Sequence, residues 1–512
     1  MKKDPTKIVL DGFSLDLDSL SAVSRGQTKV QVAPAAWDRI RASRLCVETF
    51  VHQGKVVYGI NTGFGKLASV HIPDSELNAL QRNLVFSHAC GVGPAIPPEI
   101  ARVILLLKIN TLCTGYSGVR PEVVECLLGL LNHDVIPVLP CKGSVGASGD
   151  LAPLAHLTLV LLGLGQAWVH GRRMDGAAAL ASAGLQPLEL QAKEGLSLLN
   201  GTQVLTAYAA MALLAGERLA KLADIAGAIS VESLLNSKTA FDERIQKARG
   251  HSGQIKVAEN LRRLLADSEI MDSHRQCGKV QDAYSSRCMP QVHGAVRQAL
   301  ALAHELVAVE LNSCSDNPLV FADQQEVLSG GNFHGQPLSL ASDTMAIAMA
   351  QLANISERRL ENLMDPVQSG LPPFLALESG THSGFMIAQV TAAALVSENK
   401  VLSHPASVDS IPTSANQEDF VSMAAHAGRK ALEVTENSET VLAIELLAGC
   451  QATDFRKDLE PGAGTGTAYR LIREHIPVME KDRLMYRDIE QMTQLMRNGH
   501  LLAAVENAIG PL

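Results

Sequence analysis

Hydrophobic residues recur with helical spacing along most of the chain after residue 74. Several of the periodic segments exceed 20 residues, which is long for a globular protein and typical of the core of a helical bundle. The segments that predict helices most clearly are residues 101–114, 151–164, 203–226, 292–311, 338–364, 386–403 and 421–448. The pattern therefore predicts a mainly α fold with a long central helical bundle.

The first 70 residues look different, with β-like segments at 28–32 and 55–58 separated by glycine turns. A chain of 512 residues is too long for one compact core. We expect an N-terminal domain at 1–200, a central long-helix bundle at 201–420 and a C-terminal helical layer at 421–512.

One helix of the predicted bundle has almost no polar face. Residues 392–396 read Ala-Ala-Ala-Leu-Val, in the middle of the segment 386–403. A helix that is apolar all round is normally buried, so we expect this one near the centre of the bundle.

Composition and charge narrow the class of protein. Hydrophobic residues make up 46% of the chain and charged residues 19%, which is globular composition and excludes a disordered protein. The formal net charge of −9 argues against binding to nucleic acid or to an anionic membrane. Apolar runs such as 103–107 and 157–162 fall short of the roughly 20 residues that a membrane span needs.

The nine cysteines are scattered singly, without a CxxC pair. This spacing is typical of reduced thiols and argues against a disulfide framework or a zinc site. The N-terminal residues carry lysine and aspartate in place of the apolar core of a signal peptide. We therefore expect a cytoplasmic protein that holds no metal.

Residues 143–154 combine three spaced glycines with the start of a predicted helix. They read Gly-Ser-Val-Gly-Ala-Ser-Gly-Asp-Leu-Ala-Pro-Leu, with Asp150 as a natural N-cap and Pro153 in the first turn. A tight turn or an anion-binding loop is one interpretation. A phosphate loop fits poorly, because the Gly-Lys-Ser/Thr order is missing and no strand precedes the glycines in a βαβ context.

Ala147-Ser148-Gly149 allow a third interpretation, an electrophile made by the chain itself. The unhindered nitrogen of Gly149 can attack the carbonyl carbon of Ala147, two residues back, and close a five-membered ring. Loss of water from that step and from the Ser148 side chain leaves an exocyclic methylidene. Small residues permit the compressed geometry, and free N–H groups of the helix after Asp150 can stabilise negative charge on the ring.

The same twelve residues, 143–154, resemble the prosthetic-group signature of the aromatic amino acid lyase family. Other motifs similar to the family lie at 58–65 (Tyr-Gly-Ile-Asn-Thr-Gly-Phe-Gly), 200–203 (Asn-Gly-Thr-Gln), 315–319 (Ser-Asp-Asn-Pro-Leu) and 330–335 (Gly-Gly-Asn-Phe-His-Gly). The resemblance implies an ammonia-lyase or aminomutase whose Ala147-Ser148-Gly149 cyclises to 4-methylideneimidazol-5-one (MIO), with no external cofactor. It also implies a homotetramer in which several subunits build each active site.

The resemblance also implies roles for residues outside the loop. Removing a β-proton and an α-amino group requires an electrophile, a base and a clamp on the carboxylate. Tyr58 matches the family's candidate base, and Asn200 matches a residue that lies against the prosthetic group. Without the family, Tyr58 reads as a strand-end tyrosine and Asn200 as a helix N-cap.

Gln281, Tyr284 and Arg287 are spaced three apart, so they share one face if the segment is helical. An arginine suits a substrate carboxylate, although most arginines form surface salt bridges. The resemblance assigns Arg287 to the carboxylate, with Asn317 as a second contact, and places Gln281 and Tyr284 in the active site.

A few positions bear on substrate choice. By itself His88 could be an ordinary histidine on a helix, but the pair Ser87-His88 resembles the histidine-specific branch, where tyrosine lyases have His-Leu and phenylalanine lyases Phe-Leu. Glu418 also matches that branch and can accept a hydrogen bond from an imidazole N–H. Phe333 matches the family's pocket-lining Asn-Phe-His segment. Phe420 departs from the branch, where histidine is usual, and makes the pocket edge more apolar.

These matches imply that the chain converts L-histidine to trans-urocanate and ammonia, the first step of histidine degradation. Phe420 leaves open a phenylalanine or tyrosine ammonia-lyase, or an aminomutase. A related branch that acts on a thiol-histidine betaine is disfavoured, since Thr391 stands where that branch carries lysine. A non-catalytic helical assembly protein with a degenerate loop is the alternative from another class.

Overall fold

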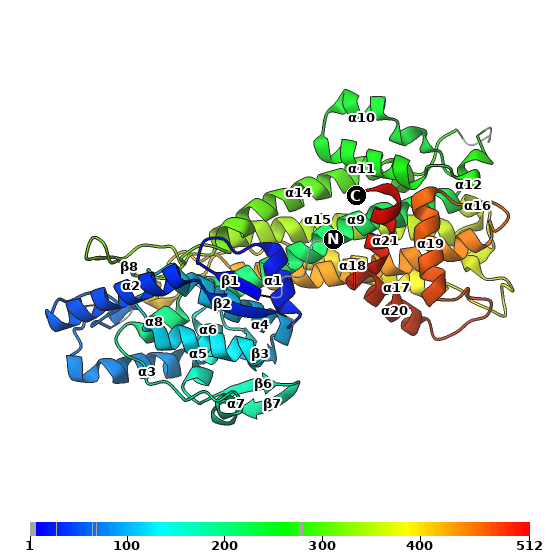
Figure 1. Cartoon of the computed structure of the whole chain (residues 1–512). Helices are drawn as coiled ribbons and strands as arrows, with labels where there is room; N and C mark the ends of the chain where they lie inside the picture. Colours follow the sequence, from blue (N-terminus) through cyan, green and yellow to red (C-terminus); the bar gives the residue numbers. More distant parts are fainter. Residues whose placement is uncertain (1–6, 27, 64, 68, 276–279) are drawn as a thin grey trace. The chain divides into compact units, whose positions relative to one another are not determined.

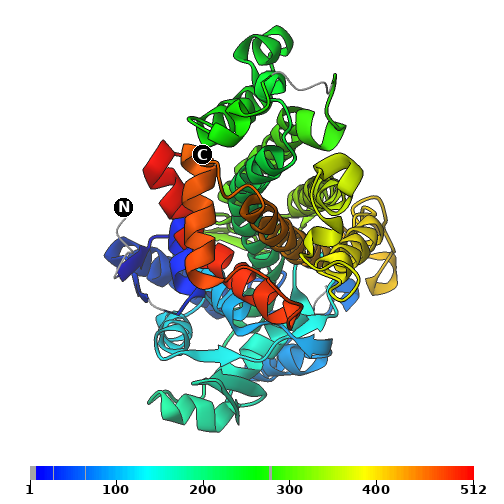
Figure 2. The ribbon, with the colours of Figure 1, turned by 90° about the vertical axis from the view of Figure 1, so that its right-hand side faces the viewer.

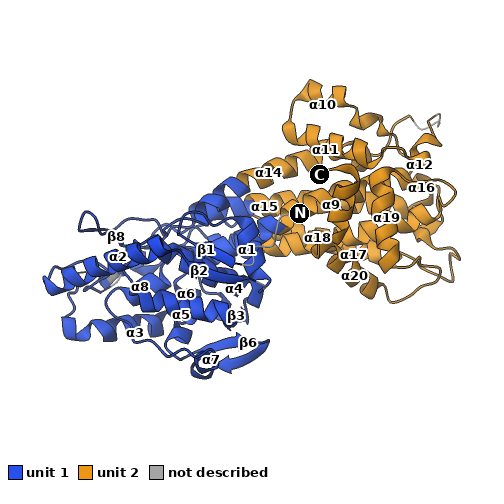
Figure 3. Cartoon of the chain, viewed as in Figure 1, with its two compact units in different colours: residues 1–214, 304–343, 405–429 blue, residues 215–303, 344–404, 430–512 orange. Residues whose placement is uncertain are grey.

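The structure is a computed structural model that describes residues 7–26, 28–63, 65–67, 69–275 and 280–512. It contains two compact units, coloured separately in Figure 3: unit 1 comprises residues 1–214, 304–343 and 405–429, and unit 2 comprises 215–303, 344–404 and 430–512. Residues 1–6, from which the sequence analysis argued against a signal peptide, lie outside the described residues, as does Phe64 of the 58–65 motif. The division into three consecutive domains stays a prediction.

Unit 1 combines short strands with helices (Figure 1). Parallel pairing joins β1 (Lys7–Leu10) to β2 (Lys29–Val32), and antiparallel pairing joins β3 (Val92–Ala95) to β5 (Pro140–Lys142) and β8 (Leu319–Phe321) to β9 (Glu326–Leu328). A three-stranded antiparallel sheet has the order β4 (Val135–Pro137), β6 (Gln166–Val169), β7 (Arg172–Asp175). The helices are α1 (Leu17–Ser24), α2 (Pro34–His52), α3 (Leu77–His88), α4 (Pro98–Cys113), α5 (Pro121–Asn132), α6 (Leu151–Leu161), α7 (Gly176–Ser182) and α8 (Glu194–Leu199).

Helix α4 forms much of the interior of unit 1. Every residue of it from Val103 to Cys113 is buried, so it has no solvent-facing side over that length. It packs against α1, α2, α5 and the strand β4. One of its buried residues, Lys108, is charged.

Unit 2 consists of helices (Figures 1 and 2). Four long helices have residues in both units: α9 (Gln203–Ser233), α14 (Met289–Glu310), α15 (Gln336–Met364) and α18 (Ala424–Asp454). The others are α10 (Glu243–Arg249), α11 (Ser252–Leu264), α12 (Glu269–Asp272), α13 (Tyr284–Arg287), α16 (Pro366–Ser369), α17 (Met386–Leu402), α19 (Ala463–His475), α20 (Met485–Arg497) and α21 (His500–Ile509). Near the C-terminus α21 packs on both α19 and α20.

Buried polar bonds link the long helices within unit 2. The Glu445 carboxylate on α18 forms a two-bond ion pair with Arg359 on α15 (2.6 and 2.9 Å) and accepts from the Ser230 hydroxyl on α9 (2.8 Å). Asp224 on α9 pairs with His293 on α14 at 2.8 Å. Buried charges of this kind need such partners, because an unpaired charge in an apolar core is very costly.

The mainly α fold predicted from the sequence is confirmed. Each of the seven predicted helical segments overlaps an observed helix, and β2 lies within the predicted strand 28–32. The strand predicted at 55–58 was wrong, because this segment is an irregular loop that follows α2. Among the described residues, no helix combines the length and apolar character needed to cross a membrane.

Helix α17 contradicts the expectation of complete burial. Within the single chain only Ala388, Ala392 and Asn399 of this helix are buried, while Ile387, Val390 and other apolar residues are more than half exposed. The sequence pattern could not distinguish burial by the chain's own core from a face left for another molecule to cover.

Candidate active site

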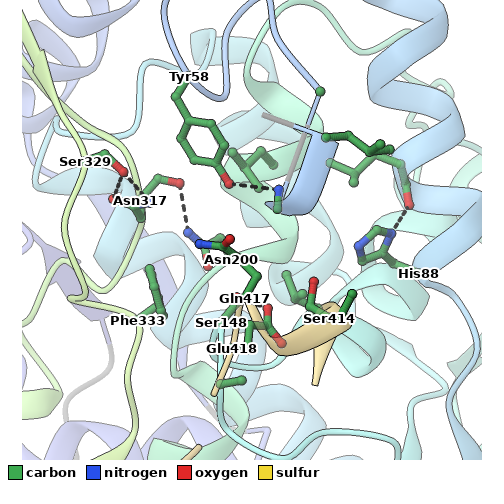
Figure 4. A pocket seen from close by; sticks show the side chains of 18 of the residues that line it. Tyr58, His88, Ser148, Asn200, Asn317, Ser329, Phe333, Ser414, Gln417 and Glu418 are labelled. Carbon is green, nitrogen blue, oxygen red and sulfur yellow. Dashed lines mark hydrogen bonds between the residues drawn. The ribbon is translucent and has the colours of Figure 1, made fainter. Parts of the chain in front are cut away.

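Unit 1 contains a cavity of about 1060 Å³ that the family-like motifs line (Figure 4). The predicted site residues on its wall are Tyr58, His88, Ala147, Ser148, Asn200, Asn317, Phe333 and Glu418. They come from sequence positions far apart, and the fold of unit 1 brings them together.

The loop Ala147-Ser148-Gly149 lies tightly against the backbone of Gly201. Gly149 has a left-handed φ of +70°, and a Cβ at this position would lie 2.1 Å from the Gly201 carbonyl oxygen. That oxygen accepts a hydrogen bond from the Asp150 N–H at 2.8 Å. Position 149 therefore has no room for any side chain, and its φ favours glycine independently.

Asp150 does not cap the helix that follows it, contrary to the sequence prediction. Its carboxylate makes no capping bond to α6 and accepts instead from the N–H groups of Val204 and Leu205 at 2.9 and 3.0 Å, in the first turn of α9. The sequence could not reveal that a second helix begins beside this loop. Complete burial raises the pKa of Asp150 to about 7, against the opposing effect of these hydrogen bonds.

The Ser148 hydroxyl points to Glu418. It donates to Oε1 of Glu418 at 2.9 Å, and Oε2 of the same carboxylate accepts from the Thr413 hydroxyl at 2.6 Å. Thr413 and Glu418 also pair through their backbones, across a turn in which residues 414–416 all have positive φ. Three consecutive non-glycine residues in this conformation are costly, which indicates that the turn is held in place by its surroundings.

His88 ends α3 and faces the cavity with one ring nitrogen already engaged. Its Nδ1 lies 2.8 Å from the Leu84 carbonyl oxygen and 3.0 Å from the Ser87 hydroxyl. A proton on Nδ1 satisfies the carbonyl and leaves Nε2 as an acceptor. Burial lowers the pKa of His88, with the Leu84 carbonyl and Glu418 opposing, so the neutral ring is favoured near pH 7.

Two asparagines form one wall of the cavity. The Asn200 amide donates to the Asn317 carbonyl oxygen at 2.9 Å and to Asp316 at 3.3 Å, while its own Oδ1 is buried with no protein partner in the described chain. The Asn317 side chain bonds Ser329 at 3.1 Å and the Gly330 N–H at 2.7 Å. Asn200 therefore offers a free acceptor, and it is not the N-cap that its position before α9 suggested.

Tyr58 lies on the irregular loop after α2 and is half-buried. Its phenolic oxygen accepts a hydrogen bond of 3.4 Å from the Gly65 N–H. The ring stands at the edge of the cavity opposite Phe333 (Figure 4).

Phe420 lies at the rim of the cavity. Its side chain is 61% exposed, and its ring stacks on His334 with centroids 6.0 Å apart and an interplanar angle of 13°. His334 also bonds the Phe420 carbonyl oxygen at 3.2 Å. The apolar edge expected from Phe420 is present, but the ring packs on a neighbour.

Gln281, Tyr284 and Arg287 lie in unit 2 and are not among the residues that line the cavity. Helix α13 covers only Tyr284–Arg287, so the shared helical face predicted for all three is wrong for Gln281. Tyr284 is 71% exposed, and the Arg287 guanidinium stacks over its ring at 4.6 Å from the centroid. Thr391 lies on α17, with its hydroxyl bonded to the Ile387 carbonyl.

The sequence analysis missed two polar residues that support the site. Thr413 orients Glu418, and nothing in its local sequence signals this. Lys108 was detectable, because it is the single charge in the mainly apolar segment Ile104–Leu112. Its ammonium donates to the carbonyl oxygen of Asn200.

The chain is similar to known proteins over almost its whole length. A family profile described as aromatic amino acid lyase matches residues 15–474. A histidine ammonia-lyase of Myxococcus xanthus is 54% identical over 98% of this chain and 99% of its own length.

Two solved structures extend the likeness to the fold. A histidine ammonia-lyase of Trypanosoma cruzi superposes with a TM-score of 0.92 at 43% identity, covering 98% of this chain and 96% of its own. A tyrosine aminomutase of Streptomyces globisporus gives a TM-score of 0.92 at 36% identity, covering 99% of both chains. The chain belongs to the aromatic amino acid lyase family.

Proposed function

We propose that this chain eliminates ammonia from L-histidine to give trans-urocanate. Membership of the family makes it a carbon–nitrogen lyase. The observation that carries the proposal is the cavity of unit 1, in which Glu418 and His88, two side chains able to bond an imidazole ring, accompany Ser148. The relatives named histidine ammonia-lyase support the same substrate.

The electrophile of the proposed reaction is an MIO group made from Ala147-Ser148-Gly149. The loop fits such a group: Gly149 has the backbone conformation of a glycine, Ala147 is small and buried, and Asn200 leaves a buried oxygen unbonded beside the cavity. The free N–H groups of α6 begin immediately after the loop and favour negative charge there. MIO, once formed, supplies an electron-poor centre that activates the amino group for departure.

Tyr58 is proposed as the base that takes the β-proton. Its oxygen accepts one hydrogen bond, from the Gly65 N–H, which stabilises negative charge on that oxygen while a proton is being exchanged. The Asn200 oxygen, which has no protein partner, is proposed to accept a hydrogen bond from the substrate's ammonium group.

His88 and Glu418 are proposed to bind the imidazole ring. With Nδ1 held by Leu84, His88 presents Nε2 as an acceptor, and Glu418 presents a carboxylate held by Thr413. An imidazole N–H can donate to one of these acceptors, whereas a phenyl ring leaves both without a partner, which costs binding energy.

The carboxylate clamp of the proposed site is Arg287, supplied together with Tyr284 and Gln281 by another copy of the chain. The Arg287 Nε is buried without a partner in the described chain, and Tyr284 is largely exposed. The exposed apolar face of α17, which includes Ile387, Val390 and Val401, gives a second copy a surface to cover. We propose a homotetramer in which subunits share active sites. The singly scattered cysteines support a cytoplasmic location.

Phe420 supports a second candidate, an enzyme of the same family that acts on phenylalanine or tyrosine, as a lyase or as an aminomutase. Its aromatic ring at the cavity rim would favour a carbocyclic substrate. The fold similarity to a tyrosine aminomutase is compatible with this alternative.

The test is the appearance of urocanate absorbance when purified enzyme is mixed with L-histidine, with L-phenylalanine and L-tyrosine assayed in parallel. Intact-mass measurement first establishes that the chain has lost two molecules of water. Turnover of L-histidine alone supports the proposal, and a cinnamate product from fully modified enzyme would replace it with the second candidate. An unmodified, inactive chain would favour a non-catalytic assembly protein.

A further inference from the structure

Lys108 is a fully buried lysine whose ammonium bonds two backbone carbonyls. It lies in the middle of α4 with none of its side chain exposed. Its Nζ donates to the carbonyl oxygens of Asn200 at 2.8 Å and Ser197 at 3.1 Å. Burying an ammonium in an apolar helix is costly, so its retention calls for a physical reason.

A nearby lysine, Lys193, shows the more usual way in which a buried ammonium is stabilised, an ion pair with a carboxylate. Lys193 is also fully buried, but it pairs with the Asp316 carboxylate at 2.9 Å. Lys108 has carbonyl oxygens as its hydrogen-bond partners, while Asp316, Asp150, Cys314 and Lys193 contribute only longer-range charge. Burial lowers the pKa of Lys108 to about 8, with Asp316 opposing, so the ammonium persists at pH 7.

The two carbonyls that Lys108 binds lie in the last turn of α8, at Ser197, and at Asn200, the residue that directly follows the helix. Helix α8 ends at Leu199, and its last carbonyls would otherwise lack donors. A cation at this end also interacts favourably with the helix dipole. The residue after Asn200, Gly201, is the one that contacts the prosthetic-group loop.

Fixing the Asn200 carbonyl fixes two groups beside the prosthetic-group loop. The Asn200 side chain lines the cavity, and the Gly201 carbonyl bonds the Asp150 N–H at 2.8 Å. Gly149 and Gly201 are also joined by a parallel bridge. A small shift of residues 200 and 201 would therefore change the geometry of the loop.

We propose that Lys108 is a positioning residue: its ammonium fixes the Asn200–Gly201 backbone and so aims the Asn200 side chain into the cavity. The proposal rests on the function proposed above, since it gives Asn200 a part in turnover. Lys108 touches neither substrate nor the reacting atoms, and it acts through Asn200.

The kinetic test is a double-mutant cycle between Lys108→Met and Asn200→Ala. We expect Lys108→Met to lower kcat per modified chain by roughly 10- to 100-fold, with KM changed less than about threefold. In the Asn200→Ala background, Lys108→Met should lower kcat by no more than about twofold, since both changes remove one effect. If the fold losses of kcat in the two single variants multiplied in the double variant, the two substitutions would act independently and the proposal would be overturned. An unchanged kcat in Lys108→Met would overturn it as well.

Lys430→Met is the matched control. Lys430 is another buried lysine that donates to a backbone carbonyl, that of His404, and it does not line the cavity. If Lys430→Met lowered kcat as much as Lys108→Met does, removing any buried ammonium would have this effect. That result would contradict the proposal.

A readout that does not depend on turnover separates this inference from the proposed function. Hydrogen exchange of the peptide 197–202 should become faster in Lys108→Met and stay at the wild-type rate in Lys430→Met. Intact mass gives the modified fraction for each protein. Where Lys108→Met does not fold, Lys108→Gln keeps a neutral donor on a side chain one bond shorter, and the peptide should exchange at an intermediate rate. An unchanged exchange rate in a folded variant overturns the positioning role, whereas faster exchange without turnover of L-histidine by the wild type would overturn only the proposed function.

Discussion

Each oxygen of the Glu418 carboxylate accepts a hydrogen bond from a hydroxyl group, one from Ser148 and the other from Thr413. The proposed conversion of Ser148 to part of MIO would remove the first hydroxyl and free one carboxylate oxygen for the substrate. Thr413 would still hold the second oxygen, so the freed oxygen is presented in a fixed orientation. In the proposed enzyme, Glu418 is therefore the residue that distinguishes an imidazole ring from a phenyl ring.

Glu418→Gln should therefore weaken binding of an imidazole but not of a phenyl ring. We expect the inhibition constant of imidazolylpropionate to rise by roughly 10-fold, because a charged acceptor is replaced by a neutral one. That of phenylpropionate should change less than about twofold, since phenyl has no N–H to donate. Competition assays against L-histidine measure both, and Thr413→Val provides a milder control that keeps the charge. Equal weakening of the two inhibitors would contradict this role for Glu418.

Asp150 makes the stability of unit 1 depend on pH. The buried carboxyl has its pKa raised to about 7 from an ordinary value of 3.8, so between these values the folded chain holds a proton that the unfolded chain has lost. Stability must therefore fall as pH rises through this window, by up to about 4 kcal/mol. In Asp150→Asn this contribution is absent.

We expect the unfolding free energy of wild type relative to Asp150→Asn to fall between pH 4.5 and pH 7.5 and then to level off. Urea unfolding across this range measures it. Asp175→Asn is the control, because Asp175 is an exposed carboxylate that makes no capping bond. Parallel pH curves for wild type and Asp150→Asn would rule out the assigned shift.

Single residues differ in how far the sequence could place them. The motifs located Tyr58, His88, Ser148, Asn200 and Glu418, and the fold does bring them to one cavity. Their roles stay predictions. The hydrogen-bond partners were not foreseeable, since Asp150 bonds a helix that begins more than 50 positions later and the Thr413–Glu418 pair depends on a turn with unusual backbone angles.

Helix α13, which carries Tyr284 and Arg287 of the proposed site, has only four residues, and polar groups of unit 2 bond to it. The Arg359 guanidinium donates to the Ser285 carbonyl at 3.3 Å, and the amides of Asn362 and Asn236 donate to the hydroxyls of Ser285 and Ser286. A four-residue helix has little stability of its own, so these contacts determine its position.

Arg359→Met should destabilise unit 2 by about 3–5 kcal/mol, because it leaves the buried Glu445 charge without its partner. The double variant Arg359→Met with Glu445→Met should recover part of this loss, since it removes the stranded charge along with the pair. Chemical denaturation followed by circular dichroism measures both variants. A double variant less stable than the Arg359 single variant would show that the pair itself, and not the unpaired carboxylate, sets the energy.

Helical periodicity located the long elements well but not their ends. The predicted segment 203–226 continues to Ser233 as α9, and the segment predicted to begin at 421 begins at Ala424 as α18. Hydrophobic periodicity continues wherever one face of a helix is buried, whereas the residue at which a helix begins or ends depends on its capping groups and on the segments packed against it. The short strands β8 and β9 escaped detection because three residues carry too little pattern.

For the molecule as a whole, the exposed apolar residues on α17 and the two active-site candidates on α13, Tyr284 and Arg287, support the same proposal. Within unit 2 the side chains of Ile387, Val390, Val401 and Tyr284 are more than half exposed, and the Arg287 Nε is buried without a partner in the described chain. The proposed association of copies would cover the exposed face of α17 and would give Arg287 a place in a shared active site. The sequence pattern could not show that α17 is exposed, because the pattern of an interface helix and that of a core helix are the same. The sharing of active sites between subunits was predicted, but only through the family resemblance.

Complementation between two inactive variants tests whether active sites are shared. Ser148→Ala removes the electrophile, and Arg287→Ala removes the proposed clamp, so each homo-oligomer should lack activity. In oligomers formed by co-expression, a site that takes Ser148 from one chain and Arg287 from another is intact about one time in four. We therefore expect mixed oligomers to show about a quarter of wild-type turnover of L-histidine per site. If both residues acted within one chain, every site would carry a lesion and the mixture would stay inactive. Mixing the separately purified oligomers without subunit exchange is the control, because restored activity must come from sites assembled from two different chains.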